Sequence, residues 1–239
     1  MFDNLGFFAS TIADGLLLTV EATVGGIVVA ALLSFVAGLA MLSPFLVVRF
    51  VARVYVEVWR GTSEVVQLLW IYFVLPILTG FQLMPLWAGI LVLGLNHGAY
   101  GAEIVRGAVQ SVPKAQYEGA VALNLTAWQR MRRVILPQAV VEMLPPFNNL
   151  FIQLLKASAL LTIVNVHEIT YQARRVLLIN HTGQALLIWT LVLLFYLVLA
   201  IVITFGMRLL ERAAAARVGR TPVERRGMLR TKALQAGVR

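Results

Sequence analysis

The stretch from Ala185 to Leu210 reads ALLIWTLVLLFYLVLAIVITFGMRLL, and Arg208 is its only charged residue. A helix needs about 20 consecutive apolar residues to cross the hydrocarbon core of a bilayer. The whole chain is similarly apolar, because 60% of its 239 residues are hydrophobic and 13% are charged. Soluble domains have about 45–50% apolar and about 25% charged residues. This composition excludes an ordinary soluble enzyme and indicates an integral membrane protein.

Four other stretches are long and apolar enough to span a membrane, although each contains polar or charged side chains. Helices satisfy their backbone hydrogen bonds internally, as lipid requires. We therefore predict an all-α integral membrane protein with about five transmembrane helices. The predicted spans lie near residues 15–41, 54–78, 85–105, 146–166 and 185–210, within a transmembrane domain over residues 1–211. Residues 212–239 form a basic tail that we expect to be disordered and attracted to anionic lipid.

Lys and Arg residues concentrate on one side of the predicted membrane, and the net charge of the chain is +9. Arg49 and Arg53 lie between the first and second spans, residues 110–137 carry several more, and the tail carries the largest group. Cytoplasmic loops are enriched in Lys and Arg. With five spans, this pattern predicts an N-terminus outside and a C-terminus in the cytoplasm. Arg174 and Arg175 are the main exception, because they lie in a loop predicted to be outside.

Residues with catalytic or metal-binding chemistry form no recognisable group in this sequence. The chain has no cysteine, and His97, His167 and His181 are well separated along it. It has no Walker A sequence, the Gly-rich motif that cradles the phosphates of ATP. We therefore expect no catalytic residue, no metal site and no cofactor in this chain.

The connection between the third and fourth spans is long and of mixed polarity. Loops longer than about 12–15 residues usually have structure or function of their own. Ser111 and Pro113 favour the start of a short helix, and Asn124 favours its end because Asn tolerates the left-handed conformation of a C-cap. Thr126 favours the start of a second helix, which Pro137 ends. We expect two short helices that form a rigid cytoplasmic protrusion.

One motif in this connection resembles a known family. It is similar in residue type and spacing to the EAA loop of ABC importer permeases. The matching positions are Glu118-Gly119-Ala120, Asn124 and Val134-Ile135-Leu136-Pro137. Gly119 stands where the motif has an Ala, and Asn124 stands where it has Gly.

Four further segments resemble the polar amino-acid permeases of the histidine, glutamate and arginine kind. They are Gly15–Thr19, Arg60–Thr62, Tyr100–Ala108 and Lys156–Leu160. That family commonly has R-G-T-P where this chain continues after Thr62 with Ser63 and Glu64. The resemblance extends over roughly residues 15–210 and is to a type I ABC importer permease.

The resemblance implies a permease subunit of an ATP-driven, binding-protein-dependent importer in the bacterial inner membrane. The expected solute is a polar amino acid or an amino-acid-like zwitterion, such as the compatible solute ectoine. The expected partners are a second permease subunit, identical or related, a pair of cytoplasmic ATPase subunits that bind ATP and Mg²⁺, an extracytoplasmic solute-binding protein and membrane lipid, with no nucleic acid. The loop residues expected at the ATPase are Gln116, Glu118, Gly119, Ala120, Asn124 and Pro137.

Several polar side chains lie deep in the predicted spans. A charged group at mid-membrane costs at least about 2.5–3.5 kcal/mol, so such groups should face the bundle interior or a wet cavity. The candidates for a solute pathway are Asn96, His97, Gln153 and Lys156. Two interpretations of Lys156 stay open, since it could attract a solute carboxylate or pair with Glu64 or Glu57. Asn96 and Gln153 could instead join helices.

Glu103 and Arg106 have the spacing of an ion pair along one helix face. We expect this pair to be structural, because it lies near the inner membrane boundary.

Two other classes of function compete with the permease. One is a secondary transporter or channel subunit driven by an ion gradient, which the loop motif argues against. The other is a small membrane enzyme with a site at the inner face, for which no group of acid, base or metal ligands is present.

Overall fold

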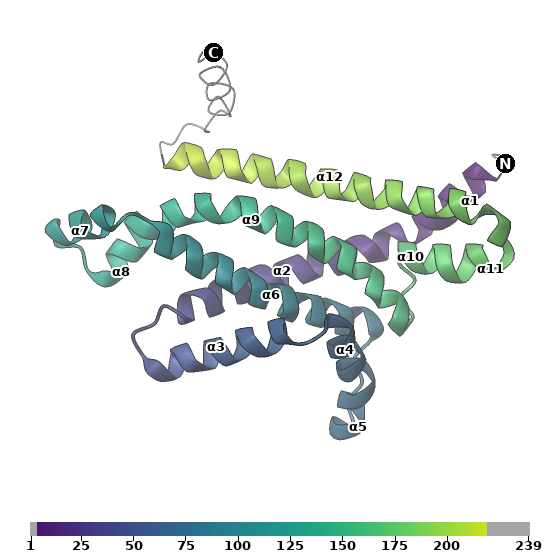
Figure 1. Ribbon diagram of the computed structural model, residues 1–239, viewed down its shortest axis with the longest axis horizontal. Coiled ribbons are helices and arrows are strands. Elements are labelled where there is room, and N and C mark those ends of the chain that lie inside the picture. Colours follow the sequence, from purple (N-terminus) through teal and green to yellow (C-terminus); the bar gives the residue numbers. More distant parts are fainter. Residues whose placement is uncertain (1–3, 219–239) are drawn as a thin grey trace, which may run out of the picture.

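The computed structural model describes residues 4–218 of the chain, and its longest helices run side by side (Figure 1). Helix α1 (Leu5–Asp14) leads directly into α2 (Leu16–Ala40). The other long helices are α6 (Pro85–Ser111), α9 (Leu136–Ala157) and α12 (Ala185–Arg217). No strand occurs between residues 4 and 218, and the predicted all-α membrane architecture is confirmed.

In the described part of the chain, 3 helical stretches are long and apolar enough to span a membrane. They are Leu5–Ala40, Ala127–Val164 and Thr182–Arg217. A fourth candidate is the bent pair Leu46–Gly61 and Glu64–Thr79. Helix α6 does not meet this apolar criterion, although its 27 residues would extend about 40 Å at about 1.5 Å per residue. That length exceeds the hydrocarbon core of about 30 Å. The count of five spans therefore stays a prediction.

The centre of the bundle is α6, which contacts α2, α3 and α9. The composition of α6 fits this central position, because many of its buried residues are small and two of them, Asn96 and His97, are polar. A Cβ atom on Gly98 would lie 2.8 Å from Cβ of Leu33. A Cβ atom on Gly38 would lie 2.7 Å from the carbonyl oxygen of Ala102. Glycines thus allow α2 and α6 to approach closely, as is common in membrane helix pairs.

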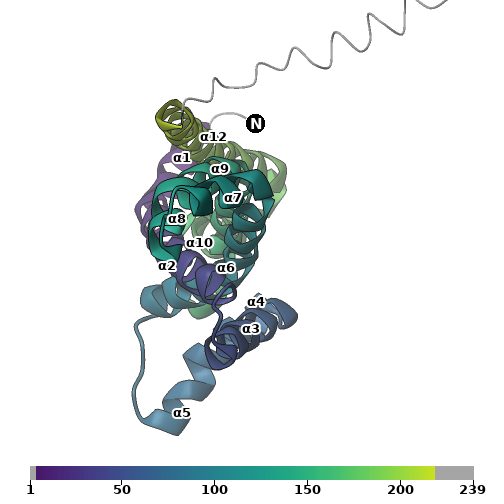
Figure 2. The same cartoon turned by 90° about the vertical axis from the view of Figure 1, so that its left-hand side faces the viewer.

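The span predicted over residues 54–78 differs from the observed structure. Helix α3 (Leu46–Gly61) ends inside it, and the next helical segment, α4 (Glu64–Leu69), leaves at an angle of 103°. Thr62 and Ser63 between them are extended, with ψ angles of 154° and 129°. Hydroxyl side chains compete for backbone hydrogen bonds and favour such breaks. Figure 2 shows the segment after the bend projecting away from the bundle.

After α4 the chain continues through the π-helical η1 (Trp70–Val74) and α5 (Leu75–Thr79). Gly80 ends α5 in the left-handed conformation with a φ angle of 70°. We call the segment from Glu64 to Gly80 the arm. It contains no charged residue after Glu64, and many of its large apolar side chains are exposed.

The two ends of the bundle carry different short elements (Figure 1). The loop end carries α7 (Lys114–Ala122), α8 (Ala127–Arg130) and the π-helical η2 (Met131–Ile135). The opposite end, which we call the α1 end, carries α1 and a series of short segments. These are η3 (Ser158–Val164), α10 (Ile169–Tyr171), η4 (Gln172–Leu177), α11 (Leu178–Asn180) and η5 (Thr182–Gln184).

Helix α9 starts earlier than the span predicted from residue 146. Pro145 and Pro146 lie inside it and do not end it. At the other end of the chain, α12 continues to Arg217, so the first residues of the predicted tail are helical. The remainder of that tail, residues 219–239, lies outside the described part of the chain, and so does its expected disorder.

A buried carboxylate organises the α1 end. Glu168 is fully buried, and its oxygens accept hydrogen bonds from the backbone N–H groups of Thr170 at 2.7 Å and Tyr171 at 2.8 Å. The hydroxyl groups of Thr162 and Tyr196 also donate to it. A buried charge needs such partners. Glu168 therefore caps α10 and ties it to η3 and α12.

Candidate functional site

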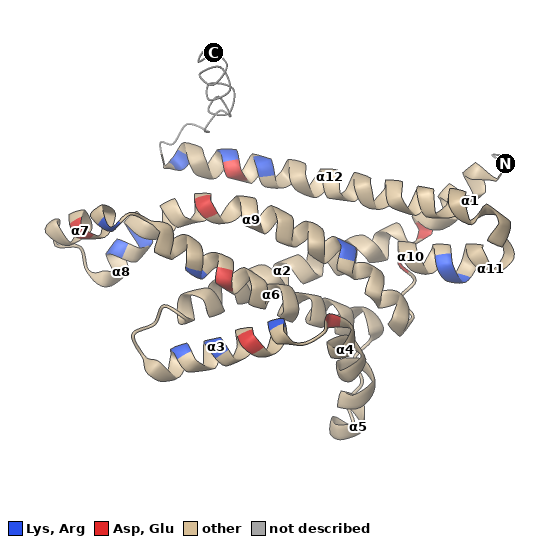
Figure 3. Cartoon of the chain, viewed as in Figure 1, with Lys and Arg blue, Asp and Glu red and all other residues tan. Residues whose placement is uncertain are grey.

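A line of charged residues follows one edge of α3. Arg49, Arg53, Glu57 and Arg60 are spaced by four, four and three residues, which places them on one helix face. Arg53, Glu57 and Arg60 are exposed, and the buried Ala52 and Val56 lie beside them. Figure 3 shows basic residues along this helix with one acidic residue among them. Because charges do not remain in contact with lipid tails, this edge requires water or a protein partner.

The bend after α3 is held by two side-chain amides. The Gln67 Nε2 group donates to the carbonyl oxygen of Trp59 at 2.9 Å and to Oγ1 of Thr62 at 2.6 Å. The Asn96 Nδ2 group donates to the same Trp59 oxygen at 2.9 Å and to Oε1 of Gln67 at 3.0 Å. Asn96 thus connects α6 to both sides of the bend. This is the helix-joining role that the sequence left open for Asn96.

Glu64 and His97 meet beside this bend. Nδ1 of His97 lies 3.4 Å from Oε1 of Glu64 and 3.1 Å from the carbonyl oxygen of Leu93. Oε1 of Glu64 is buried and has no hydrogen-bond partner within residues 4–218. An acceptor in this state can receive a hydrogen bond from a bound cationic or polar group.

A second group of charges lies about two turns further along α6. Arg106 donates from Nε to Oε2 of Glu103 at 2.8 Å, so these residues form the ion pair expected from their spacing. Arg60 of α3 also lies 3.8 Å from Oε1 of Glu103, and its guanidinium carbon lies 5.1 Å from the ring centroid of Tyr100. Glu103 therefore connects α3 to α6.

Gln153 and Lys156 do not join these groups. Both are exposed on α9. Neither makes a hydrogen bond or ion pair with Glu57 or Glu64 in the described part of the chain. Of the four pathway candidates, the structure brings together only Asn96 and His97. An exposed Lys156 within a candidate span still needs a polar environment in the membrane.

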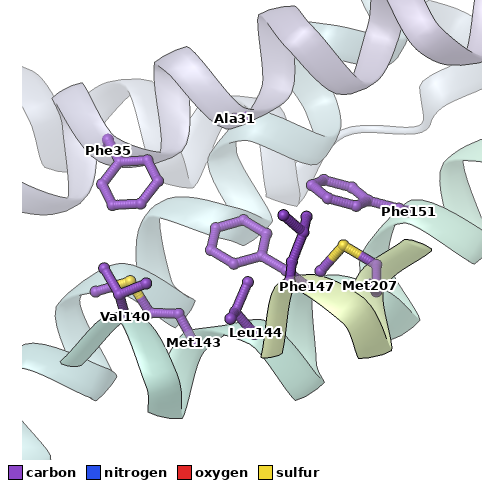
Figure 4. Close-up of a pocket in the computed structure, with 9 residues that line it drawn as sticks. Ala31, Phe35, Val140, Met143, Leu144, Phe147, Phe151 and Met207 are labelled. Atoms are coloured by element: carbon purple, nitrogen blue, oxygen red, sulfur yellow. The ribbon is translucent and has the colours of Figure 1, made fainter. Parts of the chain in front are cut away.

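The bundle also contains a small apolar pocket between α2, α9 and α12 (Figure 4). Its volume is about 110 Å³, and every residue that lines it is apolar. These residues are Ala31, Phe35, Val140, Met143, Leu144, Phe147, Phe151, Met207 and Leu210. The pocket offers no hydrogen-bond partner to a polar solute, so the charged edge of α3 is the better candidate for a solute pathway.

The connection at the loop end differs in part from the prediction. Ser111 ends α6, and Pro113 is the N-cap of α7. The second helix does not end at Pro137, because α8, η2 and α9 form one helical stretch from Ala127.

Asn124 adopts a φ angle of 54°, which confirms the left-handed conformation expected between the helices. Thr126 and Gln129 form a capping box at the start of α8. The Tyr117 hydroxyl group donates to the carbonyl oxygen of Val109 at 3.1 Å, and Gln138 donates to Gln116 at 3.3 Å. These contacts fix the protrusion to α6 and α9.

The outer surface of this protrusion is a shallow cleft of about 530 Å³, lined by Tyr117, Glu118, Val121, Ala122 and Arg130. Partial burial raises the pKa of Tyr117, and Arg130 opposes that shift. Glu118 is exposed and makes no hydrogen bond or ion pair with any described residue.

Three apolar side chains extend this surface, since 54% of Val121, 75% of Leu123 and 70% of Trp128 are exposed. Exposed apolar groups around a cleft are typical of a protein interface. Gly119 faces open space and Ala120 is buried.

Sequence reasoning missed the contact between Glu64 and His97 and the position of Arg60 against Glu103. The spacing of charges from Arg49 to Arg60 was a readable signal of an amphipathic helix. No comparable signal existed for the two contacts, because each joins elements that are distant in sequence.

These features define a helical membrane permease with a charged lateral edge and a rigid protrusion for a partner. The chain belongs to the family described as binding-protein-dependent transport system inner membrane component, which matches residues 26–215. It is therefore the inner-membrane permease subunit of an importer of the ABC class and not itself an enzyme, because a partner ATPase performs the hydrolysis in this class.

Similar proteins support this assignment. The chain is 41% identical over 209 residues to a probable amino-acid ABC transporter permease protein of Sinorhizobium fredii, with 85% of this chain and 87% of that protein covered. It is 38% identical over 200 residues to the glutamine transport system permease protein GlnP of Escherichia coli, covering 83% and 90%. It is 34% identical over 214 residues to the arginine transport system permease protein ArtQ of Bacillus subtilis, covering 87% and 97%.

Solved structures show the same fold. A chain of an amino acid ABC transporter, crystallised with histidines, matches with a TM-score of 0.79 and 30% identity, covering 89% of this chain and 98% of that chain. A chain of the MetNI methionine ABC transporter matches with a TM-score of 0.72 and 19% identity, covering 85% and 96%. The second likeness shows the fold alone.

Proposed function

We propose that this permease imports a polar amino acid or an amino-acid-like zwitterion. Relatives at 38% and 34% identity are named for glutamine and arginine transport. The observation that carries the proposal is the row of charges along α3 from Arg49 to Arg60, continued by Glu103, Glu64 and His97. A solute with both an ammonium and a carboxylate group can exchange partners along such a path.

The second permease subunit covers the charged edge of α3 and the apolar arm. Arg53 and Glu57 are too costly to leave against lipid, whereas a facing subunit encloses a wet path between the two chains. The arm offers apolar side chains for that contact, with Ile77 83% exposed and Met84, just after it, 71% exposed. Gln153 and Lys156, which are exposed on α9, extend this wet path where α9 lines it.

The protrusion at the loop end transmits movement from the ATPase. Its contacts are the exposed Glu118 and the apolar side chains of Val121, Leu123 and Trp128. In this arrangement the loop end lies in the cytoplasm and the α1 end lies outside, as the distribution of Lys and Arg favours. A pair of ATPase subunits binds ATP and Mg²⁺, and an extracytoplasmic binding protein delivers the solute.

The composition of the complex tests this proposal. The tagged chain is expressed with the genes that flank its own and extracted in mild detergent. We expect an ATPase to co-purify and to be lost on Glu118→Arg, whereas Asp14→Arg, the same charge reversal at an exposed position of the α1 end, retains it. If the chain purifies without an ATPase and still transports solute in vesicles, the ATP-driven account is wrong.

A further inference from the structure

The α1 end carries a concentrated positive charge that runs against the charge distribution of the rest of the chain. Residues 4–15 and 158–184 form most of this end, and Arg174 and Arg175 are their only Lys or Arg residues. Figure 3 shows this basic spot on the segment beside α11, remote from the basic residues of α7 and α8. Extracytoplasmic loops are depleted in Lys and Arg. A pair of adjacent arginines in such a loop therefore calls for a specific role.

Both arginines are held on a rigid support. They lie on the π-helical η4, and π-helical turns are frequent at functional sites. Their neighbours Ala173 and Leu177 are buried at 0% and 1% exposure in a cluster with Phe8, Ile12 and Ile188. The capping of α10 by Glu168 fixes the segment just before them. The support is thus packed against α1 and α12 while the arginines stay exposed.

No acidic group between residues 4 and 218 neutralises the charge of this pair. Neither Arg174 nor Arg175 makes an ion pair or a side-chain hydrogen bond in the described residues. The acidic groups of residues 4–15 and 158–184 are Asp14, which is exposed, and Glu168, whose oxygens are already occupied. The surface around the arginines also exposes apolar side chains, with Val176 at 41% and Ile179 at 66%.

We infer that Arg174 and Arg175 are the docking contact for an acidic surface of the solute-binding protein. The inference rests on the proposed function, which places the α1 end outside. Arginine beside exposed apolar side chains is typical of protein interfaces. Opposite charges also accelerate the approach of a partner that must bind and leave in each transport cycle. Anionic lipid headgroups share this chemistry, but a lipid does not require the arginines on a packed segment at the end of the bundle.

The test uses the complete complex, reconstituted in vesicles of phosphatidylcholine. The solute-binding protein is titrated, and the concentration that gives half-maximal stimulation of ATP hydrolysis is measured. For Arg174→Glu with Arg175→Glu we expect that concentration to rise about tenfold or more, since charges at an interface rim act mainly on association. The matched control is Arg212→Glu with Arg217→Glu, the same double charge reversal at exposed positions near the loop end of α12, which we expect to leave that concentration unchanged.

Ionic strength and a conservative Lys variant distinguish an effect of the lost charge from an effect of a disturbed fold. Raising the ionic strength from about 0.01 M to about 0.1 M shortens the Debye length from about 30 Å to about 10 Å. We expect this to raise the half-stimulating concentration of the wild type and of Arg174→Lys with Arg175→Lys. We expect it to lower that concentration for the Glu variant, because salt also screens the repulsion between Glu and an acidic surface. If the Glu variant loses its ATPase during purification, Arg174→Gln and Arg175→Gln are tested singly in its place.

An unchanged half-stimulating concentration in the charge variants would overturn the inference. So would an effect that appears only in vesicles with anionic lipid and does not depend on the binding-protein concentration, because the contact would then be to headgroups. Failure of the proposed function looks different, since the wild-type chain itself would then lack an ATPase.

Discussion

Oε1 of Glu64 lies 3.4 Å from Nδ1 of His97, at the point where α3 and α4 meet at 103° and face the centre of α6. A buried carboxylate oxygen without a hydrogen bond in the described residues stands here beside an imidazole. From the sequence, we predicted for Glu64 only a possible ion pair with Lys156. The structure instead places it against a pathway candidate on another helix.

Glu64→Gln tests whether this carboxylate contacts solute. We expect the KM for uptake to rise about tenfold, because a charge-assisted hydrogen bond of about 1.5–3 kcal/mol is replaced by a weaker one. The KM is measured from the uptake of a labelled amino acid by vesicles that contain the complex. Glu21→Gln makes the same change at an exposed site on α2 and should leave the KM as it is. Equal effects of both variants would remove Glu64 from the pathway.

Gln67 and Asn96 stabilise the bend as one unit. Each replacement by Ala should lower the free energy of unfolding by about 1–3 kcal/mol, because the Trp59 carbonyl oxygen loses a donor. The double variant should cost less than the sum of the two, with a difference of about 0.5–3 kcal/mol. Unfolding of the purified complex in denaturant reports these values. Strict additivity would show that the two amides act independently.

Two glycines should respond oppositely to the same substitution. Gly119→Ala adds a methyl group into open space on α7, and we expect it to be neutral or to stabilise by up to about 1 kcal/mol. Gly38→Ala places a Cβ atom 2.7 Å from the Ala102 carbonyl oxygen, so we expect a loss of about 1–3 kcal/mol and weaker packing of α2 on α6. Thermal unfolding in detergent compares them. A stabilising Gly38→Ala would contradict the close approach of these helices.

The left-handed residue of the protrusion gives a further test. Asn124 has a φ angle of 54°, so Asn124→Gly should be tolerated and Asn124→Val should cost more than about 1–2 kcal/mol in local stability. Limited proteolysis of residues 114–130 would detect the loosened loop. The Val variant should also reduce coupling of ATP hydrolysis to uptake, whereas normal coupling would show that the turn geometry is dispensable.

Much of this architecture could be predicted from the sequence because its signals are local. Apolar length predicted the long helices, and the residues at Asn124 and Thr126 predicted the turn and the second cap of the protrusion. The bend at Thr62 and Ser63 was not predicted, because the apolar run continues through it into the arm. It depends on the amide of Gln67 reaching back to Trp59 and on Asn96 from another helix.

The candidate pathway was only partly predictable for a related reason. Depth in a span identifies polar residues that need partners, but it does not say which side of the helix each one faces. Asn96 and His97 face the bend, whereas Gln153 and Lys156 are exposed on α9. Only tertiary packing separates these cases.

The central claim, that ATP drives solute through this permease, has a direct measurement. Vesicles contain the complete complex with ATP inside, receive the solute-binding protein outside, and are assayed for uptake of a labelled polar amino acid. The account predicts uptake that requires ATP and the binding protein and that is unchanged by a proton ionophore. Uptake that proceeds without ATP and is abolished by the ionophore would contradict it and favour a gradient-driven transporter.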